Sequence, residues 1–453
     1  MAYEGSVGRR RLMFGNLMAT CVVLALLSTS MNSLMSPVMD ELHVSTDVGQ
    51  WLVSGYALAL AAVMPLAGYL CSRFSSRYLY LLATGLYTTA SLGCAFAPSF
   101  ECLMVLRVVQ ACANGLVANL TQASILAIYP KGSQGGPLGL FGLSQGAAVL
   151  AGPVTCGLVA DAWGWRSVFV CAAVLCFASC VLACFVMEKL LDVRVRSFDA
   201  LSFLLSVVLF GGFTFGLSNV VSQGLLSYLV LAPLLCGVVA GFVFVRRQNA
   251  SDQPFMEVAL LRIPVFAGAV IASALLYAAM TASAALLPLY AQQAVATNVT
   301  QAGLVVLPGA IVLTVVPPIA GKAFDRWGMR PLLAAGALLL FVANAASFVS
   351  CGVWQGQPAA LLALAALNCL RMLGVALLQM PLVAWGTSAV PQASLAQGTA
   401  ILTALRNLAG AIGVAVFVGL LGVLGTQAGI QVAWLGLSFV SLCLVAVIPL
   451  VKR

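Results

Sequence analysis

The chain has 453 residues and a net charge of +9, with 62% hydrophobic residues and only 7% charged residues. An average soluble domain is about 25% charged, so this chain has too few charged side chains to cover a surface that faces water. The composition excludes a soluble enzyme, a nucleic-acid-binding protein and a secreted disulfide scaffold, and it indicates a protein that crosses a membrane many times.

Long apolar runs follow one another along the whole chain, each long enough to cross a hydrocarbon layer of ~30 Å. In chain order they lie at 12–36, 48–71, 77–97, 101–128, 134–160, 165–187, 198–219, 224–246, 263–290, 301–321, 331–350, 358–386, 393–424 and 430–451. Runs without polar alternation favour helices over barrel strands, because a spanning segment must satisfy its own backbone hydrogen bonds. The sequence therefore predicts an all-α polytopic membrane protein with 14 transmembrane helices.

Lysine and arginine in the short loops predict the orientation of these helices. With both termini in the cytoplasm, 17 of the 21 basic residues fall on the cytoplasmic side, and only Arg166 falls outside. The same rule supports the number of helices, because a single crossing over 198–246 would put Lys322, Arg326 and Arg330 outside. We therefore predict a multi-pass protein of the inner (plasma) membrane with both termini in the cytoplasm.

The basic residues and the cysteines argue against other kinds of chemistry. Lysine and arginine lie in short loops rather than on one amphipathic face, so no nucleic-acid partner is expected. Nearly all of the 14 cysteines lie inside apolar runs, and the chain has one histidine, His43. We expect the cysteines to be packing residues, with no metal site and no cofactor. The sequence contains no G-x-x-x-x-G-K-S/T phosphate-binding loop, so ATP hydrolysis by this chain is not expected to be its source of energy.

A short pattern of glycine, polar and basic residues occurs twice, in the loop after the second helix of each predicted set of six. Both copies have spacings of 4, 1 and 4 residues, and they are 253 residues apart. The first copy is Gly68, Ser72, Arg73 and Arg77, and the second is Gly321, Asp325, Arg326 and Arg330. Many transporters are built by such duplication, as two bundles about a site at mid-membrane. We therefore predict six-helix bundles over 12–187 and 263–451, with an inserted two-helix hairpin over 198–246 (6 + 2 + 6).

Five further motifs give the chain a resemblance to a known family over nearly its full length. They are Leu106-Arg107-Val108-Val109-Gln110, Gly152-Pro153-Val154-Thr155-Cys156-Gly157, Gly164-Trp165-Arg166, Phe198-Asp199 and Arg406-Asn407-Leu408-Ala409-Gly410. Together with the repeated loop pattern, they resemble the fourteen-helix drug:proton antiporters of the major facilitator superfamily. The resemblance implies the major facilitator fold and multidrug efflux by alternating access, with H⁺ as the coupling ion.

The chain departs from the antiporter pattern at several acidic and glycine positions. Ser28 and Ser72 stand where the family has aspartate, and Ala111 and Cys156 stand where it has glycine. All 12 acidic residues lie in loops or at the ends of predicted helices. A proton-coupled transporter normally needs a carboxylate or histidine within the membrane. Coupling to H⁺ is therefore implied by the resemblance alone, and the residues do not identify a proton carrier.

Three arginines lie within predicted helices, where a charge near the bilayer centre costs about 2.5–3.5 kcal/mol on insertion scales. Each therefore needs polar partners, water or a ligand. Together with amide and aromatic side chains on helices that line the cavity in this family, they form a candidate substrate site. Its members are Asn32, Arg107, Gln110, Asn114, Gln145, Tyr277, Gln379, Arg371 and Arg406. The alternative is structural, with arginines bonded to carbonyl groups, amides joining helices and aromatic rings packing.

Helix-bending residues and the repeated loop pattern form a candidate gating set. Proline removes a backbone donor and glycine admits a close neighbour, so we interpret Gly152, Pro153 and Gly157 as a gate or seal, with plain packing as the alternative. The remaining members are Gly68, Ser72, Arg73, Arg77, Gly321, Asp325, Arg326 and Arg330. We expect Asp325 to latch the cytoplasmic helix ends of the second bundle through an arginine or a helix terminus. Ser72 lacks that anion, so the first copy needs another contact.

The predicted function is efflux of small amphipathic compounds by a monomer in the lipid bilayer, without catalysis of a chemical reaction. Two alternatives remain open. One is a facilitator or exchanger for an organic anion, which embedded arginines without embedded acids favour. The other is a membrane sensor that binds a small molecule without moving it, which the altered first loop motif permits.

Overall fold

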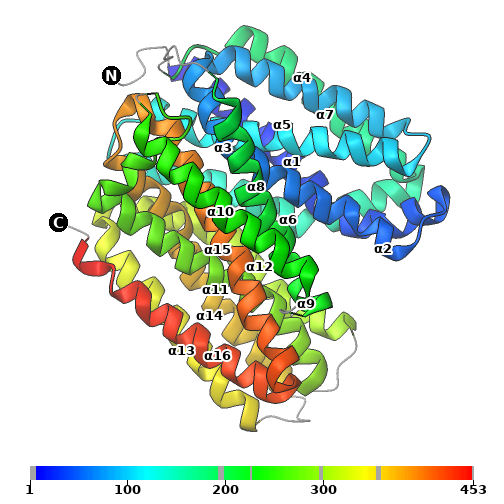
Figure 1. The fold of residues 1–453 in the computed structure, drawn as a ribbon, viewed down its shortest axis with the longest axis vertical. Coiled ribbons are helices and arrows are strands. Elements are labelled where there is room, and N and C mark those ends of the chain that lie inside the picture. The colour runs from blue at the N-terminus through cyan, green and yellow to red at the C-terminus, as the bar shows by residue number, and fades with distance from the viewer. Residues whose placement is uncertain are drawn as a thin grey trace.

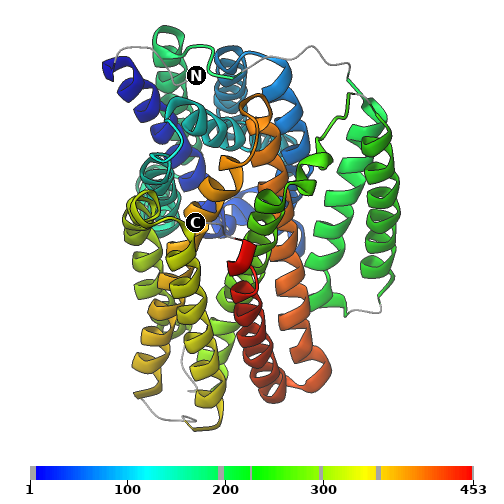
Figure 2. The same cartoon turned by 90° about the vertical axis from the view of Figure 1, so that its left-hand side faces the viewer.

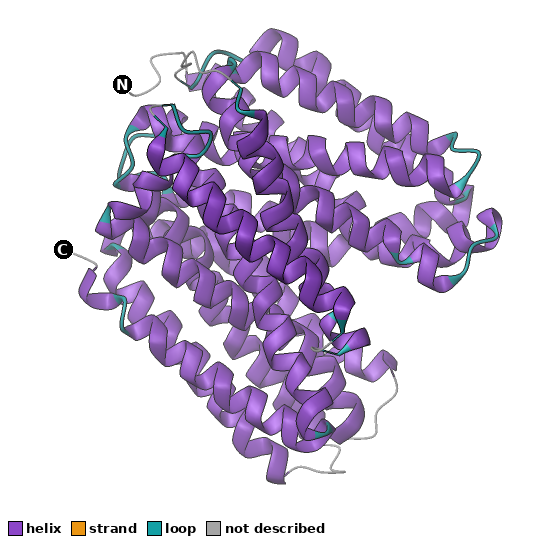
Figure 3. Ribbon diagram, viewed as in Figure 1, coloured by secondary structure: helices purple, strands orange, loops and turns teal. Residues whose placement is uncertain are grey.

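The computed structural model describes residues 7–191, 198–224, 227–251, 253–294, 299–353 and 359–450 (Figure 1). All regular elements in these ranges are helices, and no strand occurs in them (Figure 3). Thirteen of the long helices are apolar enough over 18 or more residues to cross a membrane. A fourteenth long helix, α4, lies within the first bundle, so the predicted all-α arrangement of 6 + 2 + 6 helices is confirmed.

The first bundle contains six long helices and the short α2 (Thr46–Gly49). The long helices are α1 (Val7–Leu42), α3 (Trp51–Arg73), α4 (Ser76–Ala95), α5 (Phe100–Ile128), α6 (Gly135–Trp163) and α7 (Trp165–Val186). Helix α1 packs against α6 and α7, and α4 packs against α5 and α7. The polar side chains of α4 face this packing, since Tyr80, Thr84 and Tyr87 are fully buried. Thr84 donates a hydrogen bond to the Tyr80 carbonyl, which satisfies its hydroxyl within the helix.

A helical hairpin and a second bundle complete the chain. The hairpin consists of α8 (Ala200–Ser218), the short α9 (Val220–Gln223) and α10 (Tyr228–Ala250). The second bundle consists of α11 (Pro264–Ala294), α12 (Val299–Trp327), α13 (Met329–Val353), α14 (Ala359–Ser388), α15 (Leu395–Leu424) and α16 (Thr426–Val445). Short 3-10 turns lie at η1 (Val258–Arg262), η2 (Gln392–Ser394) and η3 (Ile448–Leu450). Figure 2 shows α8 and α10, in green, standing together at the edge of the molecule.

The two bundles meet along α6 and α12, through glycines and prolines. A Cβ added at Gly139 would lie 2.8 Å from the Cα of Pro318, and one added at Gly146 would lie 2.8 Å from the Cα of Thr314. At the start of α6, a Cβ at Gly135 or at Gly321 would collide with the backbone of the other. Only glycine allows two helix backbones to approach so closely, so these residues set the distance between the bundles.

The bundles are in contact near one face of the molecule and spread apart toward the other (Figure 1). We call the face where α1 begins and α16 ends, on the left of Figure 1, the terminus face. The far end of α6 lacks the close packing of its start, since Val154 is 63% and Trp163 is 73% exposed. A Cβ at Gly157 would meet nothing within 4 Å. The structure therefore has one closed face and one open face.

Candidate functional site

A buried polar group in the first bundle surrounds Arg107 of α5. Its guanidinium group stacks on the Tyr56 ring, 4.3 Å from the ring centre, and Nη1 donates to Oε1 of Gln110 at 3.0 Å. Gln110 in turn donates to Ser91 Oγ at 2.8 Å, and Asn114 donates to the Tyr56 hydroxyl at 2.7 Å. Arg107 is 1% exposed. Three predicted site residues thus form one network inside the first bundle.

Arg371 of α14 has a related environment in the second bundle. Its guanidinium group stacks on Trp434, 4.3 Å from the ring centre. Nε donates to Asn344 Oδ1 at 2.8 Å, and Nη2 donates to Ser347 Oγ at 2.7 Å. Arg371 is also 1% exposed. Both arginines are therefore surrounded by neutral acceptors and an aromatic face, inside their own bundle rather than between the bundles.

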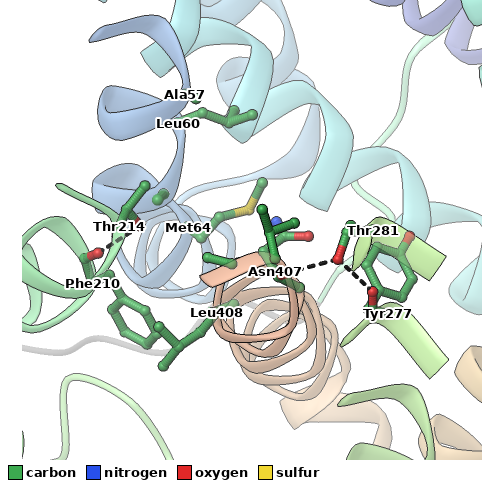
Figure 4. A pocket seen from close by; sticks show the side chains of 14 residues that line it. Ala57, Leu60, Met64, Phe210, Thr214, Tyr277, Thr281, Asn407 and Leu408 are labelled. Carbon is green, nitrogen blue, oxygen red and sulfur yellow. Dashed lines mark hydrogen bonds between the residues drawn. The ribbon is translucent and has the colours of Figure 1, made fainter. Parts of the chain in front are cut away.

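A cavity of about 380 Å³ lies between the two bundles, near the middle of the helices that form it (Figure 4). Its lining residues are Ala57, Leu60, Ala61, Met64, Phe210, Thr214, Tyr277, Thr281, Ala404, Asn407, Leu408, Gly410, Ala411 and Val414. They come from α3 of the first bundle, α11 and α15 of the second, and α8 of the hairpin. We call this cavity the chamber. In Figure 4, Asn407 lies between Met64 on one side and Thr281 on the other.

Arg406 lies beside the chamber, next in sequence to Asn407. Its guanidinium group is 4.7 Å from the centre of the Tyr277 ring, and Gln379 donates to the Tyr277 hydroxyl at 2.8 Å. The Arg406 side chain is 7% exposed, and its Nε and Nη1 atoms have no hydrogen-bond partner among the described residues. Unsatisfied buried donors of a charged group are costly. Arg107 also has one donor without a partner, its Nε atom, whereas Arg406 has two, and they lie beside the chamber and remain available to an acceptor.

At the terminus face, Asp325 joins the two bundles. Its two carboxylate oxygens accept the backbone N–H groups of Gly135 and Gly136, at 2.8 and 2.9 Å. Gln134, the N-cap residue of α6, makes no side-chain cap, so a residue of α12 caps this helix instead. A carboxylate at a helix N-terminus is stabilised by its free N–H groups and by the helix dipole. We expected Asp325 to contact either an arginine or a helix terminus. The structure contains the contact to a helix terminus, and that helix belongs to the other bundle.

The first copy of the loop pattern makes a neutral contact at the same face. Ser72 of α3 accepts a hydrogen bond from Gln397 Nε2 of α15 at 3.4 Å, and the same nitrogen donates to the Phe255 carbonyl at 3.3 Å. Nearby, Thr399 donates to Asn119 Oδ1 at 3.0 Å, which also joins α15 to the first bundle. The Ser72 hydroxyl donates to the Tyr69 carbonyl at 2.7 Å.

The remaining predicted residues are dispersed. Arg77 donates to the carbonyl of Cys184 near the end of α7, and Arg73 lies 5.8 Å from the Phe74 ring. Arg326 lies 6.0 Å from the Trp327 ring, and Gly152 packs closely on α1 beside Ser30. Pro153 lies inside α6, Gln145 lies on α6 away from the chamber lining, Arg330 lies in α13, and the side chain of Asn32 falls outside the described part of the structure.

Sequence reasoning missed most of the chamber. Asn407 and Thr281 were not singled out as ligands, and neither were Phe210 and Thr214 of the hairpin. A signal existed for Asn407, which follows Arg406 in one of the family motifs. No signal existed for Phe210, because an apolar residue that faces a cavity and one that faces lipid look alike in a sequence.

Comparison with known proteins agrees with this architecture. The Major Facilitator Superfamily model matches residues 18–414. An uncharacterised MFS-type transporter of Bacillus subtilis, YcnB, is 31% identical over 420 residues, covering 93% of this chain and 88% of YcnB. The lincomycin resistance protein LmrB of Listeria monocytogenes is 30% identical over 388 residues, covering 86% of this chain and 81% of LmrB. A crystal structure of the human organic anion transporter MFSD10 matches with a TM-score of 0.63 and 15% identity, covering 97% of this chain and 100% of that chain.

The family match covers most of the chain, and relatives at 30% identity or above are matched over most of their length. The chain therefore belongs to the major facilitator superfamily. It is a membrane transporter with many spanning helices, which sits in a lipid bilayer and carries small molecules. The likeness to the human structure extends to the fold alone, because the identity is 15%.

Proposed function

We propose that this protein exports small amphipathic compounds across the plasma membrane by alternating access, as a monomer. The observation that carries the proposal is the chamber, which is lined by both bundles at mid-height. Most of its lining side chains are apolar, and a few polar ones, such as Asn407 and Thr281, stand among them. Pockets of this composition bind compounds with a large apolar surface and a small polar group.

The distribution of charge supports an orientation with the terminus face in the cytoplasm. Lysine and arginine are concentrated in the loops on that face, as the positive-inside rule requires of cytoplasmic loops. With this orientation, the closed face is cytoplasmic, and the conformation corresponds to an outward-facing state. The contact between Asp325 and α6 then belongs to the cytoplasmic gate, and it must break before the chamber can open to the cytoplasm.

The proton gradient is the driving force that the family resemblance implies. The described carboxylates lie near helix ends or in loops, such as Glu41 at the end of α1, Glu101 at the start of α5 and Asp325 near the end of α12. A proton carrier within the membrane is therefore not evident among the described side chains. Coupling to H⁺ must be tested apart from transport itself.

Counterflow in proteoliposomes tests the proposal. Purified protein would be reconstituted with lincomycin or ethidium inside, and uptake of the labelled compound measured against liposomes without protein. We expect saturable uptake of at least one amphipathic probe, with and without an imposed pH gradient. Binding of the probes without flux under any gradient would instead support a sensor. Flux that a pH gradient leaves unchanged would remove proton antiport and keep the transporter.

A second candidate function, transport of organic anions, is supported by Arg406. Its guanidinium group has unpartnered donors beside the chamber, and no described carboxylate neutralises it. An anionic group of a substrate would satisfy these donors. Counterflow of carboxyfluorescein, an anion, in parallel with ethidium, a cation, separates the two candidates. Faster flux of the anion, lost in Arg406→Gln, would favour this second function.

A further inference from the structure

The hairpin helix α8 lies across the seam between the two bundles. Near the terminus face, Phe198 at its start packs on Tyr69 of α3, with ring centres 5.6 Å apart. At mid-height, Phe210 is 3% exposed and packs in one apolar cluster with Met64 of α3 and Ala404 of α15. Helix α8 thus contacts both halves of the transporter along the seam between α3 and α15.

The far end of the hairpin also contacts both halves. Phe215 stacks on Trp51 of α3, with ring centres 5.9 Å apart. Val220, in the short α9, packs in an apolar cluster with Ala415 of α15. The hairpin therefore covers this seam from the terminus face to the open face, and at mid-height it separates the chamber from the lipid.

One side of α8 belongs to the chamber and the other faces outward. Phe210 and Thr214 are four residues apart, so they lie on one helix face, and both line the chamber (Figure 4). Leu201 and Leu204 are 50% and 58% exposed, as expected for the side that faces lipid. The hairpin thus has a chamber side and a lipid side.

A second cavity lies between α3 and the hairpin, nearer the open face. Its volume is about 460 Å³, and its lining includes Gln50, Ser54 and Ser218. Thr214 lines both cavities. Its hydroxyl donates to the Phe210 carbonyl at 2.7 Å, within α8. The lining of the chamber is mainly apolar, and that of the second cavity is more polar. Along α8, an amphipathic molecule would therefore meet first an apolar lining, in the chamber, and then a more polar one, nearer the open face.

We infer that α8 of the inserted hairpin is a wall of the transport chamber and of its outward route, and that Phe210 and Thr214 contact the transported amphiphile. This inference rests on the proposed function. Phe210 provides an apolar contact in the chamber and contributes to selectivity among substrates. Thr214 lines both the chamber and the more polar cavity nearer the open face. The two extra helices are thereby part of the substrate pathway rather than an addition to the outside of the transporter.

Three variants of α8 test this inference in the reconstituted full-length protein. Phe210→Ala removes apolar contact with the probe, and Thr214→Trp places a large side chain at the position that lines both cavities. Leu204→Ala is the matched control, because it removes a side chain from the lipid side of the same helix. Counterflow of ethidium and lincomycin, and binding of each probe measured by equilibrium dialysis, are compared with the unmodified protein.

We expect Phe210→Ala to change the ratio of the two apparent affinities by about tenfold, because the probes differ in the apolar surface that they bury. Thr214→Trp should lower the flux of both probes by a larger factor than it lowers their binding, because Thr214 lines both the chamber and the cavity nearer the open face. A fourth variant, Thr214→Ser, keeps the hydroxyl and should keep the flux, and Leu204→Ala should match the unmodified protein.

Two results would overturn the inference. One is that Phe210→Ala and Thr214→Trp behave like Leu204→Ala. The other is that they lower binding and flux of both probes by one common factor, which indicates a structural role. If the unmodified protein moves neither probe, the proposed function fails, and binding still decides the inference. In that case, unchanged selectivity of binding in Phe210→Ala contradicts a contact between the hairpin and the ligand.

Discussion

The two copies of the loop pattern make unequal contacts at the terminus face. In the second copy, the Asp325 carboxylate accepts two backbone N–H groups at the start of α6. In the first copy, Ser72 occupies the same register and accepts one side-chain hydrogen bond, from Gln397 of α15, at 3.4 Å. Each contact joins the end of one helix to the start of a helix in the other bundle. The two copies therefore occupy equivalent positions, but one makes a charged contact and the other a neutral one.

This difference separates two seams with different properties. Charge-assisted hydrogen bonds are about twice as strong as neutral ones, and the seam of α6 and α12 has glycine contacts as well. The seam of α3 and α15 also has a close glycine contact, between Gly68 and Ala400, but the described hydrogen bonds across it at this face are neutral. This second seam holds the chamber and the hairpin. We therefore regard the seam of α6 and α12 as the more stable contact between the bundles, and the seam of α3 and α15 as the one where the substrate enters.

The largest effect is expected from Gly321→Leu, which breaks the seam of α6 and α12. The new side chain would collide with the backbone of Gly135, and overpacking of this kind costs about 1–3 kcal/mol. We expect counterflow to fall by at least about tenfold, because the closed face can no longer form. Gly85→Leu is the matched control, since a Cβ at Gly85 meets nothing within 4 Å. Equal loss of transport in the two variants would refute the role of this contact.

Asp325→Asn should weaken the same seam more selectively. The amide keeps the shape of the carboxylate but loses its charge and one of its two acceptor oxygens at the helix N-terminus. The charge alone is worth about 0.3–2 kcal/mol. We expect the population with a closed terminus face to fall, as measured by distances between spin labels on α6 and α12. Asp161→Asn, at the far end of α6, is the control. An unchanged distance distribution in Asp325→Asn would show that the carboxylate does not latch the bundles.

Ser72→Asp should make the two seams more alike. It places a carboxylate near the start of α15, where a favourable charge interaction is worth about 0.3–1 kcal/mol. We expect the population with a closed terminus face to rise, whereas Asp325→Asn should lower it. We expect counterflow to slow. The labelling rate of a cysteine placed on α15 at the terminus face reports this change. Faster labelling than in the unmodified protein would contradict the expected strengthening.

Ser72→Ala should have a smaller effect than Asp325→Asn. It removes one neutral hydrogen bond between the bundles, whose net contribution is about 0.5–1.5 kcal/mol, and the long distance of 3.4 Å places it at the low end. It also removes the hydrogen bond to the Tyr69 carbonyl, which lies within α3 and does not join the bundles. Counterflow of both variants is compared at matched expression. Equal losses would mean that the two latches contribute equally, and the asymmetry would have no functional meaning.

The smallest effect concerns pH and the hairpin. Arg247 forms a two-point ion pair with Asp199 and, through it, lowers the pKa of that carboxyl from 3.8 to about 2. The stabilisation is present above the ordinary pKa and is lost as pH falls through about 2. Between about pH 5 and 8 the contribution of this pair is therefore constant, and thermal unfolding should show no pH dependence that comes from it. Because the pair is partly exposed, Asp199→Asn should cost less than about 1 kcal/mol. If the free energy of unfolding changed with pH between about 5 and 8, and this change disappeared in Asp199→Asn, the lowered pKa of Asp199 would be contradicted.

The fold could be predicted from the sequence because membrane-spanning helices are recognised by length and hydrophobicity alone. All fourteen long helices overlap the predicted apolar runs, and α4 was found despite its lower hydrophobicity. Helix ends were less predictable. Helix α1 extends over Val7–Leu42 rather than 12–36, because polar residues continue a helix beyond the apolar run without any change in hydrophobicity to mark its end.

The site could be predicted only in part, because its partners are distant in sequence or belong to the backbone. The absence of embedded acids predicted that Arg107 and Arg371 need neutral partners. It did not predict which residues those partners are, such as Asn344 and Ser347 for Arg371. The contact of Asp325 goes to backbone N–H groups, which have no sequence signal. The chamber itself depends on how α8 is placed against α3 and α15, and composition does not reveal that.

Distances between spin labels on both faces test alternating access most directly. One pair would join Ser133 to Trp327 at the terminus face, and the other would join Trp163 to Leu424 at the open face. Labels would be introduced through a non-canonical amino acid, because the chain has 14 native cysteines. Rocking of two bundles about the chamber requires that addition of a transported probe lengthen the first distance and shorten the second. Distances that stay fixed, or that change in the same direction, would contradict it.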